Sequence, residues 1–148
     1  MPTSLKPITL DNFDAIIALE VSADQNFVAS NLKSLAEAYA SKVDICLAIY
    51  SDVTPVGFIM YNIDTASHSL WISRFMIDKK YQGKGYGKAA LNLIKDIAQK
   101  DEKVTKLQLS THHTNTSAIA FYENFGFVDT HTTDNDPEDP EEIFEFVL

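Results

Sequence analysis

The feature that most constrains the fold is an apolar, aromatic segment that runs directly into a glycine-rich one. Residues 71–77 (WISRFMI) have the composition of a buried strand, and residues 83–87 (GKGYG) precede a segment with helical periodicity. Glycine adopts positive φ readily and lets an anion approach the backbone. A helix N-terminus has unpaired N–H groups and about half a positive charge, so it attracts phosphate. The spacing Gln82-x-x-Gly85-x-Gly87 therefore predicts a ligand that carries a pyrophosphate.

Two other phosphate-binding motifs do not fit this segment. A P-loop requires Ser or Thr after Gly-Lys, but Gly85 follows Lys84. A dinucleotide-binding fold requires Gly-x-Gly-x-x-Gly and an acidic residue about 20 residues later. Here the spacing is Gly83-x-Gly85-x-Gly87, and residues 106–109 contain no carboxylate. The glycines alone are also compatible with a tight turn that only begins a helix and binds no ligand.

The composition favours a single-domain protein of the cytoplasm. The chain has 148 residues, no run of 18 apolar residues and no signal-like N-terminus, so no membrane partner is expected. The one cysteine, Cys46, lies in an apolar strand pattern and is expected to be buried and inert. With one cysteine and scattered histidines, the sequence contains no zinc-type ligand set, and no metal site is expected.

The formal net charge of −9 is concentrated near the C-terminus. Residues 134–142 contain no Lys or Arg and six carboxylates: Asp134, Asp136, Glu138, Asp139, Glu141 and Glu142. An acidic protein binds nucleic acid poorly, so no nucleic-acid partner is expected. The acidic segment is either a host for a polycation or a solvated loop that aids solubility.

The apolar pattern predicts alternating strands and helices. Strands are expected at residues 7–10, 45–50, 56–63, 69–77, 106–110, 127–131 and 143–148, with a turn at 51–55. Helices are expected after an N-cap at Asp11, over residues 31–42 and 85–100, and from a cap at Thr116 or Ser117 to Asn124, ended by Gly126. This order implies an α/β fold with a mixed sheet of about seven strands and helices on both faces.

Two motifs carry a family resemblance. Gln82-x-x-Gly85-x-Gly87 after an aromatic strand, and Asn115-x-x-Ala118-x-x-x-Tyr122-x-x-x-Gly126-Phe127, resemble the GNAT superfamily of acetyl-CoA-dependent N-acetyltransferases. The resemblance extends over nearly the whole chain and implies one N-acetyltransferase domain, residues 1–148. Residues 21–28, 71–78 and 81–85 are similar to bacterial spermine/spermidine N-acetyltransferases.

The resemblance implies acetyl-CoA as co-substrate and gives roles to particular residues. The pantetheine arm pairs with the strand backbone, the pyrophosphate rests on the glycine loop, Asn115 bonds the cofactor arm, and Tyr122 lies near the sulfur. Lys84 and Lys88 either add charge near the phosphates or are ordinary solvated lysines. The implied cofactor-binding residues are Phe75, Met76, Ile77, Gln82, Gly83, Lys84, Gly85, Tyr86, Gly87, Lys88, Asn115 and Tyr122.

Acetyl transfer to an amine requires loss of a proton from nitrogen. A primary amine with a pKa of about 10.4 costs about 4.6 kcal/mol to neutralise at pH 7. Many members of the superfamily have a carboxylate on the central strand at the position that Ser73 occupies here, and serine is no base at neutral pH. The remaining candidates, acting through water, are Glu20, Asp24 and the acidic segment. The candidate substrate-binding residues are Glu20, Asp24 and Ser73.

The sequence assigns no catalytic role to three further polar side chains near the predicted site. Arg74 is either a structural ion-pair partner or a group that crowds the acceptor site. His112 and His113 are read as loop histidines rather than a catalytic base, because no partner spacing supports that role.

The leaving thiolate also needs a proton donor. A tyrosine with a pKa of about 10 stays protonated at neutral pH, which makes Tyr122 the candidate general acid. Its alternative role is that of a core aromatic. A backbone N–H near Phe75 or Met76 is the expected donor to the carbonyl oxygen.

The resulting hypothesis is acetyl transfer from acetyl-CoA to a primary amine of spermine or spermidine, by direct attack in a ternary complex. The alternatives are another small amine, an amino acid or a peptide N-terminus as acceptor, and a non-catalytic acyl-CoA-binding module. The sequence leaves open which nitrogen is acetylated and the oligomeric state, with which a homodimer is compatible.

Overall fold

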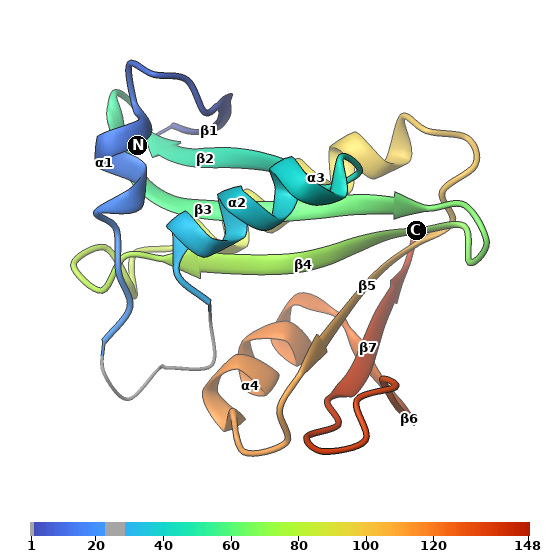
Figure 1. Cartoon of the computed structure of the whole chain (residues 1–148). Coiled ribbons are helices and arrows are strands. Elements are labelled where there is room, and N and C mark those ends of the chain that lie inside the picture. Colours follow the sequence, from blue (N-terminus) through green and yellow to red (C-terminus); the bar gives the residue numbers. More distant parts are fainter. Residues whose placement is uncertain (1, 23–28) are drawn as a thin grey trace.

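The computed structural model describes residues 2–22 and 29–148. Over these residues the chain forms a seven-stranded mixed sheet with the strand order β1-β2-β3-β4-β5-β7-β6 (Figure 1). The strands are β1 (Thr3–Pro7), β2 (Ile45–Ser51), β3 (Thr54–Asp64), β4 (Ser69–Ile77), β5 (Lys106–Thr111), β6 (Val128–Thr133) and β7 (Glu142–Val147). β4 and β5 are parallel, and the other neighbouring strands are antiparallel.

Helices cover both faces of the sheet, as the sequence predicts. They are α1 (Phe13–Ile17), α2 (Asn31–Ser41), α3 (Tyr86–Gln99) and α4 (Thr116–Phe125). Successive β3 side chains point to opposite faces. Phe58 and Met60 therefore pack with Ile16 below α1 and α2, while Ile59 packs with Leu91 of α3. Figure 1 shows α2 crossing one face of β2, β3 and β4, with α3 behind the sheet.

The sheet divides at its centre, between β4 and β5. The two strands pair only where residues 69–72 lie beside residues 106–109. Beyond Ile72, β4 continues beside β3 alone, and β5 continues beside β7. In Figure 1, β5 and β7 leave β4 at a wide angle. This divergence opens a gap along the second half of β4.

A β-bulge marks the point where the strands separate. Met60 pairs with Arg74 and Tyr61 pairs with Ile72, so Ser73 is the extra residue of β4. A bulge bends its strand and increases the local twist. The bend accounts for the loss of pairing between β4 and β5.

The predicted boundaries are wrong at three places. The first strand ends at Pro7, because the Thr9 carbonyl accepts the N–H groups of Asn12 and Phe13 in a turn that leads into α1. The N-cap of α1 is Asn12 rather than Asp11. The N-cap of α4 is Asn115, one residue before the predicted Thr116.

The remaining elements were predicted within a few residues. The strand at residues 69–77 has the predicted limits, and Gly126 ends α4 with φ +124°, as expected for glycine at a helix C-terminus. Pro55 belongs to β3, so the turn after β2 is shorter than predicted. Among the described helices, none is both long and apolar enough to cross a membrane.

Candidate active site

The glycine loop between β4 and α3 forms an open cradle. Gly83 and Gly85 have φ values of +77° and +88°, a conformation that glycine adopts without strain. A Cβ atom added at either position would have no other atom within 4 Å, so the space above the loop is open. Gly85 is the N-cap of α3, which has 14 residues. The N-terminal N–H groups of a full-length helix therefore face space that fits a phosphate group.

A buried carboxylate holds this loop in place. Asp78 follows β4 directly and is 2% exposed. Its Oδ2 accepts the Glu20 N–H at 2.9 Å and its Oδ1 accepts the Lys80 N–H at 2.9 Å. The Tyr81 N–H donates to the Asp78 carbonyl at 2.8 Å. The sequence reasoning missed this role, although a carboxylate directly after an apolar strand is a usable signal.

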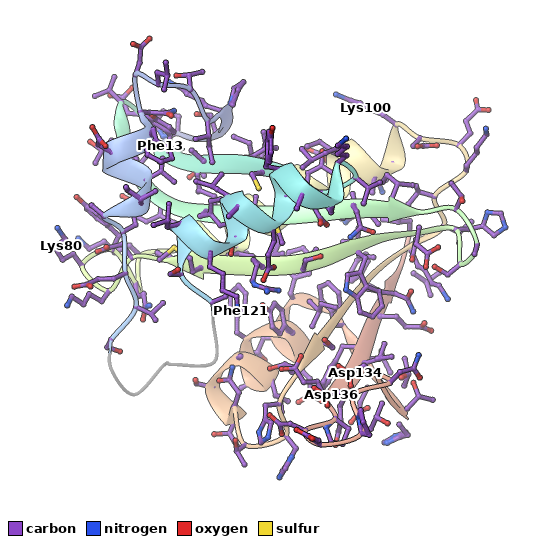
Figure 2. All side chains as sticks on the ribbon, in the orientation of Figure 1. Phe13, Lys80, Lys100, Phe121, Asp134 and Asp136 are labelled. Atoms are coloured by element: carbon purple, nitrogen blue, oxygen red, sulfur yellow. The ribbon has the colours of Figure 1, made fainter. Side chains whose placement is uncertain are left out.

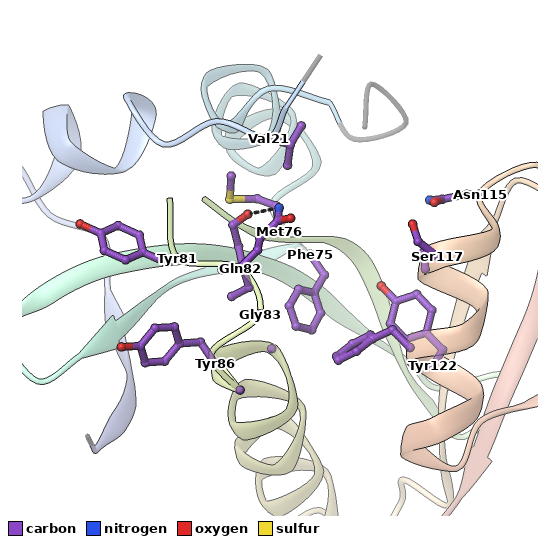
Figure 3. Close-up of a pocket in the computed structure, with 15 residues that line it drawn as sticks. Val21, Phe75, Met76, Tyr81, Gln82, Gly83, Tyr86, Asn115, Ser117 and Tyr122 are labelled. Carbon is purple, nitrogen blue, oxygen red and sulfur yellow. Dashed lines mark hydrogen bonds between the residues drawn. The ribbon is translucent and has the colours of Figure 1, made fainter. Parts of the chain in front are cut away.

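The backbone of β4 offers hydrogen-bonding groups to the gap. The Asp78 N–H donates to the Val56 carbonyl of β3 at 2.8 Å. Hydrogen bonding alternates along an antiparallel ladder, so the backbone groups of Ile77 and Phe75 face away from β3, and those of Met76 face toward it. In agreement, Gln82 Nε2 donates to the Ile77 carbonyl at 2.9 Å (Figure 3). The edge of β4 that faces the gap is thus formed by Phe75 and Ile77.

A cavity of about 270 Å³ lies between the glycine loop, β4 and α4 (Figure 3). Ten of the predicted cofactor residues line it: Phe75, Met76, Ile77, Gln82, Gly83, Gly85, Tyr86, Gly87, Asn115 and Tyr122. The cavity also includes residues that the sequence did not assign to the cofactor: Val21, Tyr81, Ser117, Ala118 and Phe121. They come from segments far apart in the chain, and only the fold brings them together.

The two lysines of the loop lie outside this lining. Lys84 and Lys88 are exposed, and Lys84 Nζ is 5.9 Å from the centre of the Tyr81 ring. Among the described residues, neither lines the cavity. The cradle itself is thus glycine backbone and helix terminus, and the contribution of Lys84 or Lys88 to phosphate binding stays a prediction.

Tyr122 is a residue of α4 in the wall of this cavity. Figure 3 shows its ring directed from α4 into the cavity, across from Phe75. The ring packs edge-on against Phe121 and Phe127, at centroid distances of 5.4 and 5.7 Å. Burial raises the pKa of Tyr122 to about 12. The hydroxyl is therefore fully protonated at neutral pH.

A second cavity, of about 460 Å³, adjoins the first. Phe75, Asn115, Ala118 and Tyr122 line both cavities, so the two spaces meet between β4 and α4. We call this second space the acceptor cavity. Its other lining residues are Ala29, Trp71, Ile72, Ser73, Arg74, Leu109, Ser110, Thr111, Asp134 and Glu141.

Ser73, the bulge residue, lies in the wall of the acceptor cavity. Asn62 Nδ2 donates to the Ser73 Oγ at 3.3 Å and also donates to Asp44 Oδ1 at 3.0 Å. Asn62 thus connects the hydroxyl to Asp44, and no carboxylate stands at position 73 itself. Proton removal from an amine therefore requires a group elsewhere in the cavity.

The structure places the predicted acidic residues of the acceptor site differently. Glu20 forms an exposed ion pair with Lys79 at 2.8 Å and, among the described residues, lines neither cavity. Asp24 lies outside the described residues. In contrast, Asp134 and Glu141 from the β6–β7 loop line the acceptor cavity. Over residues 2–22 and 29–148, the carboxylates that line the acceptor cavity come from the acidic segment rather than from Glu20.

The β6–β7 loop is held by hydrogen bonds of its own carboxylates. Asp134 Oδ1 accepts the Glu141 N–H at 3.1 Å, and Asp136 Oδ1 accepts the N–H groups of Glu138 and Asp139. Ser110 Oγ donates to Glu141 Oε1 at 2.9 Å, which joins the loop to β5. Figure 2 shows Asp134 and Asp136 on the same half of the molecule as α4.

A histidine provides a second attachment for the loop. His112, which directly follows β5, has Nε2 2.8 Å from Asp139 Oδ1 and Nδ1 2.6 Å from Thr114 Oγ1. Its ring stacks on that of His113 at 4.5 Å. Among the described residues, neither histidine lines the two cavities, and no group of three or more His, Cys, Asp or Glu is placed to hold a metal ion.

A donor with a phosphate-bearing arm fits the first cavity and a second substrate fits the adjoining one, which is the geometry of an acyl-transferring enzyme. The chain belongs to the Acetyltransferase (GNAT) family, whose model matches residues 13–127. The family predicted from the motifs is therefore confirmed, and acetyl-CoA is the co-substrate.

The relatives agree with this assignment. A "Probable spermine N(1)-acetyltransferase" of Bacillus subtilis subsp. natto is 36% identical over 135 residues, and a "Spermine/spermidine N(1)-acetyltransferase" of Bacillus subtilis strain 168 is 35% identical. Each match covers 86% of this chain and 88% of the relative. The spermidine N-acetyltransferase of Vibrio cholerae, solved with CoA and spermine, superposes with a TM-score of 0.75 at 17% identity, covering 98% of this chain and 95% of the other. At that identity the likeness shows the fold.

Proposed function

We propose that this enzyme transfers the acetyl group of acetyl-CoA to a primary amine of spermine or spermidine. The names of the two Bacillus relatives support this acceptor class. The observation that carries the proposal is the position of Asp134 and Glu141 in the cavity that adjoins the acetyl-CoA site. Carboxylates at that position attract an acceptor with several ammonium groups.

The reaction proceeds by direct attack where the two cavities meet. The neutral amine nitrogen attacks the acetyl carbonyl carbon, the new C–N bond forms, and the C–S bond breaks. CoA leaves as a thiolate that gains a proton, and the nitrogen loses one. The Phe75 N–H faces the gap by the alternation along β4 and is the proposed donor to the carbonyl oxygen as negative charge develops there.

Tyr122 is proposed to serve the leaving sulfur. Its pKa of about 12 lies above that of a thiol, which is about 8.5 for cysteine, so complete proton transfer to the thiolate is unfavourable by itself. The hydroxyl therefore donates a hydrogen bond that stabilises the thiolate. Its proton moves to sulfur as the proton lost by the amine is returned to Tyr122 through water.

The proton of the acceptor ammonium is proposed to leave through water toward the acidic end of the cavity. Ser73 has no basic group, whereas Glu141 and Asp134 are carboxylates on the cavity wall. Either carboxylate could act as a general base through a bridging water. Glu20 is bound to Lys79 and is a weaker candidate.

One assay separates this function from its alternatives. CoA release is measured with spermine, spermidine and butylamine at saturating acetyl-CoA. A kcat/KM at least tenfold higher for the polyamines is expected, because butylamine has no second ammonium for the carboxylates. Equal values for all three would favour a general small-amine or peptide acetyltransferase. Tight acetyl-CoA binding with no release for any amine would favour a non-catalytic binding module.

The cellular setting is proposed to be the cytoplasm. Cys46 is the chain's single cysteine and is a free thiol, as is typical of a reducing compartment. The homodimer stays a prediction that sedimentation velocity would test.

A further inference from the structure

A cation lies in the wall of a cavity proposed to receive a polycation. Arg74 follows the bulge residue of β4, precedes Phe75, and lines the acceptor cavity. An arginine stays charged at any physiological pH. Left unpaired, this charge would repel each ammonium group of spermine. The cavity therefore needs a partner for Arg74.

Glu37 of α2 is that partner. Arg74 Nη2 is 3.0 Å from Glu37 Oε2, and Arg74 Nη1 donates to the Ser73 carbonyl at 2.9 Å. Arg74 Nε is buried and, within the described part of the chain, has no hydrogen-bond partner. Within the described part of the chain, the carboxylate bound to this guanidinium thus comes from α2, and its other oxygen, Glu37 Oε1, lies 3.9 Å from Lys33 Nζ. The side chains of Arg74 and Glu37 are 28% and 40% exposed, so the pair is only partly buried, and of the two Arg74 lines the acceptor cavity.

Arg74 of β4 and two carboxylates of the β6–β7 loop, Asp134 and Glu141, lie in the wall of the same cavity. Asp134 and Glu141 contribute negative charge there. With Glu37 bound to it, Arg74 adds little positive charge to that wall. Without Glu37, the same cavity would have an uncompensated cation beside Phe75, where the amine reacts.

We infer that Glu37 determines specificity for polycationic acceptors by neutralising Arg74. Glu37 acts through Arg74 and is a positioning residue rather than a catalytic one. The inference rests on the proposed polyamine function. Because Coulomb energy scales with the charge of the acceptor, loss of Glu37 penalises spermine more than spermidine, and both more than a monoamine. A purely structural tie between α2 and β4 would affect all acceptors alike.

The test is a set of variants assayed with spermine, spermidine and butylamine at saturating acetyl-CoA. Glu37→Gln is expected to raise the KM for spermine roughly tenfold, the KM for spermidine less, and the KM for butylamine least, with kcat within about threefold of the wild type. Arg74→Met is expected to lower the KM for spermine, because it removes the cation and leaves Glu37. The double variant Glu37→Gln/Arg74→Met is expected to return the KM for spermine toward the wild-type value.

Glu145→Gln is the matched control. Glu145 pairs with Lys106 at 3.5 Å between β7 and β5, and among the described residues it lines neither cavity. Glu145→Gln makes the same change from carboxylate to amide, and it should leave the ratios of KM among the three acceptors unchanged. Thermal unfolding of each variant checks that it folds.

The outcomes separate the inference from the function beneath it. If Glu37→Gln raises the KM of every acceptor by one factor, or the double variant shows no recovery, the pair is structural and the inference is overturned, while the polyamine function stands. If Glu37→Gln does not fold, Arg74→Met still decides, since a KM for spermine that rises contradicts compensation. If the wild type acetylates no polyamine, the proposed function fails first.

Discussion

Replacing Gly85 by valine tests whether the N-terminus of α3 binds the phosphates of acetyl-CoA. Gly85 has φ +88° and open space where a side chain would begin. Valine would place two methyl groups in the space where the pyrophosphate is expected to lie. Each hydrogen bond from a backbone N–H to a charged group contributes about 1.5–3 kcal/mol. Losing one such bond weakens binding by a factor of about 10 to 150.

The same substitution also strains the backbone, and this effect must be separated from the loss of binding. A left-handed conformation costs a residue with a Cβ about 1–2 kcal/mol. Asp52 offers a matched control, because it has φ +54°, is exposed in the turn after β2, and among the described residues lines neither cavity. Asp52→Val imposes comparable strain without reaching the cradle.

Isothermal titration calorimetry with acetyl-CoA measures the outcome, and urea unfolding gives the stability of each variant. Gly85→Val is expected to raise Kd at least tenfold, and Asp52→Val to leave Kd unchanged at a similar loss of stability. A Gly85→Val protein that is folded and binds acetyl-CoA with wild-type affinity would show that the phosphates bind elsewhere.

Four further predictions concern individual side chains. Tyr122→Phe should lower kcat roughly 10²-fold with little change in acetyl-CoA affinity, and a wild-type kcat would assign Tyr122 to packing. Burial raises the pKa of Tyr122 from 10.0 to about 12, so the neutral side chain contributes stability that is fully present below pH 10 and is lost between pH 10 and 12. Over that range, urea unfolding should show that the free energy of unfolding falls by about 2–3 kcal/mol more for the wild type than for Tyr122→Phe. Burial, with a smaller effect of Asp44, raises the pKa of Cys46 to about 11, so at pH 8 iodoacetamide should alkylate it far more slowly in the folded than in the urea-unfolded chain. Glu141→Gln should raise the KM for spermine more than it lowers kcat and should reduce the salt dependence of KM; an unchanged KM would make this carboxylate a structural partner of Ser110.

The conformation of the glycine loop could be predicted from the sequence because its causes are local. Positive φ at Gly83 and Gly85, and the start of a helix beside them, depend on residues that are neighbours in the chain. The strand before the loop was predicted with its observed limits for the same reason, since a run of apolar and aromatic residues specifies it. The wrong prediction of a strand at residues 7–10 also has a local cause. Residues 8–10 are apolar enough for a strand but form a turn in which the Thr9 carbonyl accepts two N–H groups.

The acceptor cavity could not be predicted in the same way. Glu37 and Arg74 are 37 residues apart, and no periodicity relates them. The composition of residues 134–142 shows the charge of that segment but not its place. Only the insertion of β7 between β5 and β6 brings Glu141 beside Ser110 and into the cavity.

The division of the sheet connects these two sites. Where the bulge at Ser73 bends β4 away from β5, the strand loses a neighbour, and the backbone groups of Phe75 and the Ile77 N–H face the gap, while the Ile77 carbonyl accepts Gln82 Nε2. The same divergence separates α4 from β4 enough for two adjoining cavities, with Phe75 and Tyr122 in the wall of both. A strand that paired with β5 along its whole length would bury the edge proposed to bind the acetyl donor and would close the adjoining space. One extra residue in β4 thus accounts for two cavities that meet beside Tyr122, where donor and acceptor are proposed to react.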